Sequence, residues 1–480
     1  MTRTSLYLSL TLSLLAAGCG GSNNAPEQAV SDTPDTNPFF AESDLPYHLP
    51  PFDKISHEHY LPAFERGMAE QMSEIEAIAN SADSATFENT VVAIERSGQM
   101  LDRTNRVFSA MTSAHTNDDL EEIDTIMSPL FAAHYDSILL NKALFARVDT
   151  LYEGRDDLGL DAESLRLLER YHTDFIRAGA QLSDEQKVRL REINSERAEL
   201  STAFGQNVLS EVNDSAVVVD TRAELAGLSD NAIESAATEA TKRGLGGKFV
   251  ITLRNTTQQP ALTSLKNREL RQRIQETSAA RGSRGNEYDN RDIVARVLAL
   301  RAERAAMLGY DNHAAYILED RTAGSIGAVN DMLGKLGPRA VANARREAND
   351  LQALIDEIES ESFQIASWDW LYYSDILRQQ RYDFDADQLK PYFEINRVLQ
   401  DGVFFFAERL YGVTFDERPE LPVYQEDVRV FEVFFDGEPL GLFLFDPYAR
   451  ESKRGGAWMN AYVSQSHLLE SKPVVANHLN

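Results

Sequence analysis

Cysteine is almost absent from this 480-residue chain, since Cys19 is the only one. A single thiol excludes an intrachain disulfide. Basic residues are also scarce: 47 Lys and Arg stand against 76 Asp and Glu, which gives a formal net charge of −29. Such a surface repels phosphate backbones, so we expect no nucleic-acid partner. It also disfavours attachment to anionic lipid by charge alone.

Complete catalytic motifs are absent as well. The sequence contains no G-x-S-x-G turn and no glycine-rich phosphate loop. His57 and His59 flank Glu58 and suggest a metal site, but a helical zinc motif places its two histidines four residues apart. The spacing of two favours surface or helix-capping histidines. The local sequence alone therefore supplies no catalytic machinery.

The N-terminus has the features of a targeting segment. Residues 1–18 contain one positive charge and an apolar run that is too short for a membrane span, as in a secretory signal. The sequence Leu-Ala-Ala-Gly-Cys resembles a bacterial lipobox, with Ala16 where leucine is commonest. We expect Cys19 to be lipidated; the alternative is a plain secretory signal with an incidental cysteine. Residues 19–44 are rich in Gly, Ser, Asn, Pro and Asp, which predicts a flexible tether.

Helical periodicity dominates residues 45–410. Apolar residues recur there at three- and four-residue steps, which is the pattern of a helix with one buried face. The clearest example is residues 183–204, where Ser183 and Gln186 have the spacing of a capping box. The sequence therefore predicts a mainly α fold.

Two strand-like stretches interrupt this pattern. The first, near residues 214–253, we interpret as the boundary between an N-terminal helical lobe (45–255) and a second domain (256–480). The second begins at Val428, where the period changes to two across an Asp-Gly pair typical of a hairpin turn. It predicts a small β-sheet near the C-terminal end of a two-lobed helical protein.

The sequence R-G-G-A-W places two glycines in a strand-like run. Glycine weakens a strand unless another backbone must approach it closely. A peptide could pair there through its main chain, so we take Gly455, Gly456, Ala457 and Trp458 as candidate substrate-binding residues. A bulge or turn is the alternative. The aromatic cluster at residues 368–373 could line a channel, but packing in the core is the simpler interpretation.

Long segments resemble one known family from about residue 45 to the last residue. They include "LPPFDKISHEHYLPAFERGMAEQ", "TFENTVVAIERSGQML" and "LPVYQEDVRVFEVFFDGEPLGLFLFDPYARESKRGGAWM". These segments are similar to the thimet oligopeptidase, neurolysin and oligopeptidase A family of zinc metallopeptidases. The stretches "WDW", "QLKPYFE" and "RGGAWM" resemble its bacterial peptidyl-dipeptidase branch, dipeptidyl carboxypeptidase.

The resemblance implies a neurolysin-type, zincin-like fold with a deep channel that admits short unstructured peptides. It also implies one zinc ion, held by two histidines of an H-E-x-x-H helix and a glutamate from a following helix. In the family this helix follows the R-G-G-A-W strand. We therefore expect the catalytic and zinc-binding residues to lie beyond Asn480, the domain at 256–480 to be incomplete, and the 480-residue chain to be inactive.

The function implied by the resemblance is release of C-terminal dipeptides from short peptides by a zinc metallopeptidase. One alternative is a non-catalytic peptide-binding lipoprotein that keeps the channel and lacks zinc. Another is an oligopeptidase with endopeptidase specificity. The lipobox at Cys19 leads us to expect a monomeric, periplasm-facing lipoprotein, attached to the outer membrane through its lipid alone.

Overall fold

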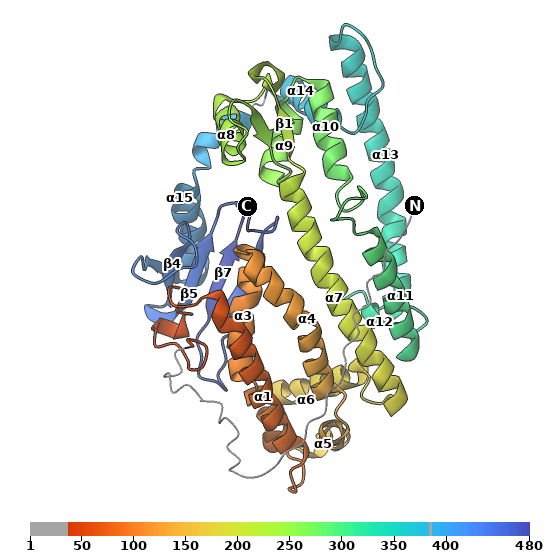
Figure 1. The fold of residues 1–480 in the computed structure, drawn as a ribbon, viewed down its shortest axis with the longest axis vertical. Coiled ribbons are helices and arrows are strands. Elements are labelled where there is room, and N and C mark those ends of the chain that lie inside the picture. The colour runs from red at the N-terminus through yellow and green to blue at the C-terminus, as the bar shows by residue number, and fades with distance from the viewer. Residues whose placement is uncertain (1–36, 384–385) are drawn as a thin grey trace, which may run out of the picture. The chain divides into compact units, whose positions relative to one another are not determined.

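The computed structural model describes residues 37–383 and 386–480 (Figure 1). The expected signal at residues 1–18, the lipidation site Cys19 and the tether up to Thr36 lie outside the described residues. The prediction that the tether extends to residue 44 is wrong. Phe39 is 3% exposed within a hydrophobic core, and the amide of Asn37 donates to the carbonyl of His59 at 2.8 Å. The aromatic side chain at 39 therefore ties this segment to the folded body.

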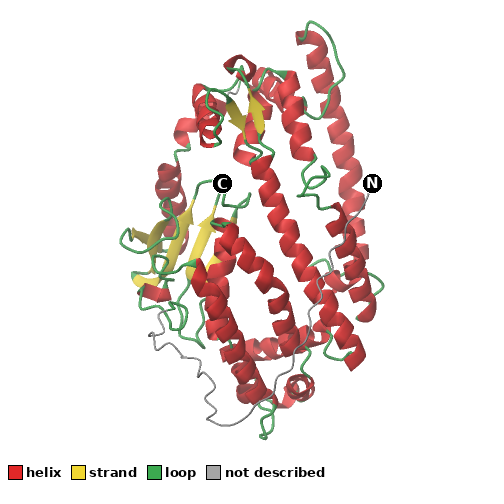
Figure 2. Ribbon diagram, in the orientation of Figure 1, coloured by secondary structure: helices red, strands yellow, loops and turns green. Residues whose placement is uncertain are grey.

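Helices make up most of the described chain, which confirms the mainly α prediction (Figure 2). Those of the first half are α1 (Tyr60–Ala79), α2 (Ala93–Arg96), α3 (Gln99–Ala114), α4 (Asp118–Leu139), α5 (Lys142–Glu153), α6 (Ala162–Ala178), α7 (Asp184–Asp214) and α8 (Asp230–Lys242). Those of the second half are α9 (Asn255–Ser264), α10 (Arg268–Ala279), α11 (Arg291–Met307), α12 (His313–Glu319), α13 (Ile326–Ile358), α14 (Trp370–Tyr382), α15 (Ile395–Arg397) and α16 (Phe405–Tyr411).

Helix α7 begins where its capping box predicts. The hydroxyl of Ser183 accepts from the backbone N–H of Gln186, and the Gln186 side chain accepts from the N–H of Ser183. Two of the otherwise unpaired N–H groups at this end of the helix are thereby satisfied. The predicted apolar face is present in the first half of the segment, where Leu190 and Ile193 are fully buried, but Phe204 at its end is 41% exposed.

The strands form two separate sheets. Strands β1 (Val217–Val219) and β2 (Phe249–Ile251) make a small antiparallel pair within the stretch predicted as strand-like. Strands β3 (Val413–Glu417), β4 (Arg429–Phe435), β5 (Glu438–Asp446), β6 (Trp458–Val463) and β7 (Val474–His478) make a five-stranded sheet in the order β3-β4-β5-β7-β6 (Figure 2). The predicted C-terminal sheet is thus confirmed.

The hairpin between β4 and β5 is tight. Asp436 and Gly437 have φ values of 50° and 81°, as the two central residues of a type I′ turn require. Beyond β5 the chain does not continue to the neighbouring position. Instead β6 takes the edge of the sheet, and β7 then fills the gap, parallel to β5 and antiparallel to β6.

The first helices and the last strands share one hydrophobic core. Its buried members come mainly from α1, α3, α4, β4, β5, β6 and β7 and include Phe64, Phe108, Leu444, Tyr462 and Ala476. Residues 37–480 accordingly form one compact unit. The division at residue 255 stays a prediction.

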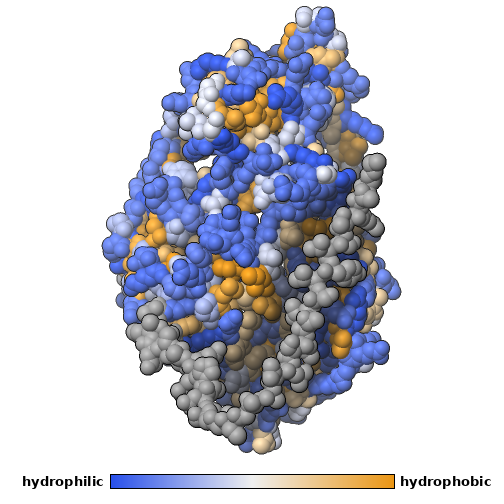
Figure 3. Space-filling view, in the orientation of Figure 1, coloured by the Kyte–Doolittle hydropathy of each residue, from blue (hydrophilic) through white to orange (hydrophobic). Residues whose placement is uncertain are grey.

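Apolar surface occurs in patches on a mainly hydrophilic face (Figure 3). Within the described chain, no helix combines the length and apolar character that a membrane crossing requires.

Candidate functional site

The R-G-G-A-W sequence lies at the entry to the edge strand β6. Gly455, Gly456 and Ala457 are exposed and precede the strand, which begins at Trp458. The glycines therefore form a turn leading into the strand, whereas the sequence pattern placed them in the strand itself. Among the described strands β6 pairs only with β7, so its other edge faces away from the sheet. The structure thus places the four candidate residues together at a sheet edge.

The two glycines differ in what the backbone demands of them. Gly456 has a φ of 114°, a conformation that side chains with a Cβ rarely adopt, so the turn alone accounts for glycine there. Gly455 has no positive φ, and a Cβ added to it would meet no atom within 4 Å. Neither strain nor crowding explains its missing side chain. Close approach of another backbone remains the hypothesis for Gly455.

Main-chain carbonyls at both ends of β6 already accept hydrogen bonds from side chains of the protein. The guanidinium of Arg106 on α3 donates to the carbonyl of Ala461 at 3.4 Å. The amide of Asn480 donates to the carbonyl of Gly456 and, at 3.2 Å, to that of Arg454. Met459 lies between these contacts with its side chain 63% exposed. Between these contacts, Ala457 and Met459 are exposed.

Trp458 packs against the sheet. The indole stacks on the ring of His478, with 4.9 Å between the two ring centroids. The guanidinium of Arg454 lies over the indole, 4.5 Å from the ring centroid. The indole N–H donates to the Asn460 side chain at 2.9 Å. The indole therefore has a defined structural role, and its part in substrate binding stays a prediction.

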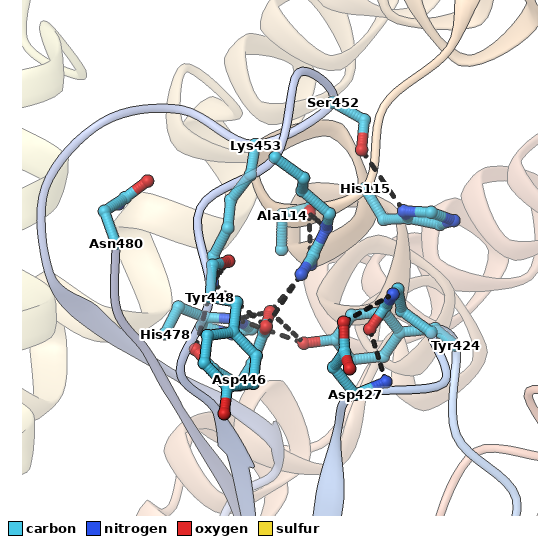
Figure 4. Close-up of polar contacts among 12 residues, drawn as sticks. Ala114, His115, Tyr424, Asp427, Asp446, Tyr448, Ser452, Lys453, His478 and Asn480 are labelled. Atoms are coloured by element: carbon cyan, nitrogen blue, oxygen red, sulfur yellow. Dashed lines mark hydrogen bonds and ion pairs between the residues drawn. The ribbon is translucent and has the colours of Figure 1, made fainter. Parts of the chain in front are cut away.

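The buried carboxylate of Asp446 binds side chains of the segment that leads into the glycine turn (Figure 4). Asp446, at the end of β5, is fully buried and accepts hydrogen bonds from Arg450, Tyr424 and the Nδ1 of His478, at 2.7 to 3.1 Å. The ammonium of Lys453 lies 3.0 Å from the same carboxylate and donates to the carbonyls of Asp446 and Tyr448. We call these five side chains, of Asp446, Arg450, Lys453, Tyr424 and His478, the Asp446 network.

The segment leading to the glycines is also attached to the end of α3. Arg450 donates to the carbonyl of Ala114 at 2.9 Å. The N–H of Arg454 donates to the carbonyl of Ser113 at 3.0 Å, and the carbonyl of Ser452 accepts from the N–H of Thr116 at 2.9 Å. The turn is thus fixed on one side by the Asp446 network and on the other by a helix of the N-terminal half.

The electrostatics of the network favour an ionised Asp446. Burial raises the pKa of a carboxyl group, but hydrogen bonds from Arg450, His478, Tyr424 and Lys453 outweigh it and hold the pKa of Asp446 well below its usual range. Because the ionised carboxylate only accepts, the Nδ1 of His478 carries the proton. Its Nε2 is buried and has no hydrogen-bond partner among the described residues. Asp446, Lys453 and His478 are buried, and Tyr424 and Arg450 are half-buried, so we assign the network a role in positioning the strand.

The histidine pair does not form a metal site. His59 accepts from the backbone N–H of Ser56 at 3.0 Å at the start of a short 3-10 helix, and His57 lies 3.5 Å from Asp119. The interpretation as surface or capping histidines is confirmed. Over residues 37–383 and 386–480, no three His, Cys, Asp or Glu side chains are arranged to hold a metal ion.

The aromatic cluster at residues 368–373 belongs to the core, as expected. Tyr373 is 2% exposed, and Asp369 within the cluster is fully buried. Arg268 and Arg271 contact the Asp369 carboxylate at 2.8 and 3.0 Å. The cluster therefore joins α10 to α14 through a buried ion pair.

No sequence pattern indicated the Asp446 network. Lys453 and Asp446 are ordinary charged residues in the sequence, and His478 has no ligand-spaced partner. Their contact depends on β7 lying beside β5, a pairing between segments about 30 residues apart. The feature that marks the network is the burial of Lys453, and burial cannot be read from the sequence.

Removal of the Asp446 charge should destabilise the protein strongly. Asp446→Asn leaves Lys453 and Arg450 buried without their counter-ion, so we expect a loss of about 3–5 kcal/mol in the free energy of unfolding. Urea titration at pH 7 measures this loss. Glu438→Gln, an exposed change on the same strand, should stay within about 0.5 kcal/mol.

The difference in the free energy of unfolding between wild type and Asp446→Asn should also depend on pH. Because the folded-state pKa of Asp446 is depressed, its stabilisation is complete above the unfolded pKa of about 4 and is lost as the pH falls below it. The gap between wild type and Asp446→Asn should therefore narrow below about pH 4. A gap under about 1 kcal/mol at pH 7 would contradict the role of the buried charges.

Comparison with known proteins is consistent with this arrangement. Residues 261–480 match the model of peptidase family M3. The chain is 44% identical to dipeptidyl carboxypeptidase of Salmonella typhimurium over 93% of its own length and 42% identical to that of Escherichia coli over 92%. It is 30% identical to oligopeptidase A of Escherichia coli over 90%. The chain spans 65%, 65% and 63% of these three proteins. The resemblance to the thimet oligopeptidase, neurolysin and oligopeptidase A family is thus confirmed, and residues 261–480 are similar to peptidase family M3.

Proposed function

We propose that this protein acts on short unstructured peptides as a peptidyl-dipeptidase, removing dipeptides from their C-terminal ends. The higher identity to dipeptidyl carboxypeptidases than to oligopeptidase A supports this specificity. The chain spans 65% of the length of those carboxypeptidases. The activity of the whole enzyme is therefore proposed for this protein.

The observation that carries the proposal is the exposed entry to β6. Neither backbone strain nor crowding requires glycine at position 455. The neighbouring residues Ala457 and Met459 are exposed. A peptide that adds to a sheet edge is bound through its main chain, and bulky side chains at that edge hinder its approach. We assign residues 455–460 the task of binding and orienting the peptide backbone.

Zinc, which the resemblance implies, does not fit the described residues, because they contain no suitable set of donors. We therefore assign them no hydrolytic step. A peptide-binding protein without catalysis is the second possibility, and hydrolysis of a short peptide by this protein would exclude it. An oligopeptidase that cuts internal bonds is the third possibility, and the fragments released from a long peptide distinguish it from a dipeptidase.

Substitution of Gly455 should weaken peptide binding without weakening the fold. In Gly455→Val a branched side chain obstructs main-chain pairing, so we expect about tenfold weaker binding, equivalent to losing one or two hydrogen bonds. The affinity of several unrelated peptides is measured by fluorescence anisotropy, together with Tm. All should weaken by similar factors, because main-chain pairing does not depend on side chains.

The matched control is Gly246→Val, which adds the same side chain at another glycine with ordinary φ and no atom near its Cβ. It should leave peptide affinity unchanged. Unchanged binding by Gly455→Val, or weakening for one peptide sequence alone, would refute main-chain pairing at this edge. Gly456 is unsuitable for the test because its positive φ makes any substitution strain the turn.

For the 480-residue chain we expect peptide binding without stoichiometric zinc. Equilibrium dialysis against zinc followed by elemental analysis measures the bound metal. Tight zinc binding that is lost in a His57→Ala, His59→Ala double variant would contradict our assignment of these histidines. Release of C-terminal dipeptides by this chain would show that it contains the metal site.

We also propose that Cys19 is lipidated and holds the protein on the outer membrane, facing the periplasm. The proposal rests on the lipobox-like sequence, and on Gly20, where an aspartate would favour retention in the inner membrane. Expression in a Gram-negative host should give a membrane-associated protein, and Cys19→Ser should release it or leave it unprocessed. Ser22→Ala is the control. Equal distribution of wild type and Cys19→Ser between fractions would argue for simple secretion.

A further inference from the structure

Three arginines without a carboxylate partner lie where α11 packs against α7 and α12 (Figure 1). Arg197 belongs to α7, and Arg301 and Arg304 are one turn apart on α11. The Nε atoms of all three are buried and have no hydrogen-bond partner among the described residues. The Nδ1 of His313, at the start of α12, is in the same situation. We call these four residues the arginine cluster.

Three glutamates around the cluster are already paired with other arginines. Their ion pairs are Glu303 with Arg189 at 2.7 Å, Glu196 with Arg296 at 2.5 Å, and Glu319 with Arg177 at 2.7 Å. Asp136 on α4 is buried and accepts from the neutral amide of Asn194. Burial raises its pKa and the charge of Arg304 opposes that shift, so Asp136 is one carboxylate close to the cluster. Within a chain of net charge −29, the cluster is therefore a local excess of positive charge.

The members of the cluster are close enough to affect one another. Burial lowers the pKa of Arg197, and the charges of Arg304 and Arg301 lower it further. Burial and the same three arginines lower the pKa of His313. Arg304 is held in place by the ring of Tyr316, 4.9 Å from its guanidinium. Like charges with unused donors at a helix interface cost stability unless a counter-ion is present.

We propose that the arginine cluster binds a small tetrahedral oxyanion of the phosphate or sulfate type. Guanidinium groups present planar pairs of N–H donors that match oxyanions well, and three of them here have Nε donors without partners. The bound anion would neutralise the repulsion between α7 and α11 and so stabilise the packing of α12 beside them. This site is separate from the edge of β6 and does not depend on the proposed peptidase function.

Thermal unfolding of the 480-residue chain tests the site directly. Tm is measured against sodium phosphate, and separately sodium sulfate, with sodium chloride adjusted to keep the ionic strength constant. We expect a saturable rise in Tm with phosphate or sulfate, because an anion that binds only the folded state stabilises it. Equal Tm values in phosphate, sulfate and chloride at matched ionic strength would overturn the proposal.

Arg301→Gln locates the effect. Calorimetric titration with phosphate should show about tenfold weaker binding, as expected from loss of a charge-assisted hydrogen bond. Without added phosphate its Tm should equal or exceed that of wild type, because Arg301 has no ion-pair partner among the described residues and its removal relieves repulsion. A purely structural role would instead lower Tm.

The matched control is Arg296→Gln on the same helix, which removes the same charge from an arginine already paired with Glu196. It should keep the phosphate response. A phosphate response that survives Arg301→Gln, or that Arg296→Gln reduces equally, would overturn the assignment. If Arg301→Gln does not fold, Arg197→Gln makes the same test from α7.

Discussion

The buried carboxylate of Asp446 is the constraint on which the geometry of the candidate site depends. An ionised carboxylate without water is costly unless donors satisfy its oxygens, and here Arg450, Lys453, Tyr424 and His478 do so. These donors come from the segment before the glycine turn, from the loop that precedes β4 and from the strand β7. Other conformations of residues 450–456 would leave buried charges unpaired. The position of the turn, and with it the start of β6, follows from this requirement.

The N-terminal helices complete the support. The side chains of Phe64 and Phe108 share a core with those of the sheet, so the sheet is covered on one face by helices from the other end of the chain. Arg106 on α3 donates to the far end of β6 at Ala461, and the end of α3 bonds to the segment before the glycines. The strand is held at both ends, while its middle remains accessible at Met459. A rigid edge loses little conformational entropy when a peptide binds to it.

Local signals in the sequence predicted the local structure. The capping box at Ser183 and the Asp436-Gly437 turn are decided by neighbouring residues, and both are confirmed. The edge position of β6 could not be predicted from neighbouring residues, because it depends on β7 filling the gap beside β5. The strand boundary at Trp458 and the buried Lys453 depend on the same non-local pairing. The composition around Phe39 is typical of a tether, but its side chain packs in the core beside the ring of Tyr60. The arginine cluster likewise requires α7 and α11 to be adjacent.

Hydrogen–deuterium exchange of the β6 amides tests the central claim, that a peptide pairs with the main chain at this edge. Exchange over residues 455–463 is measured with and without a saturating concentration of each of several unrelated peptides. The account predicts slower exchange at these amides with every peptide, because their N–H groups become hydrogen-bonded. Unchanged exchange over these residues, with protection at other parts of the chain, would contradict it.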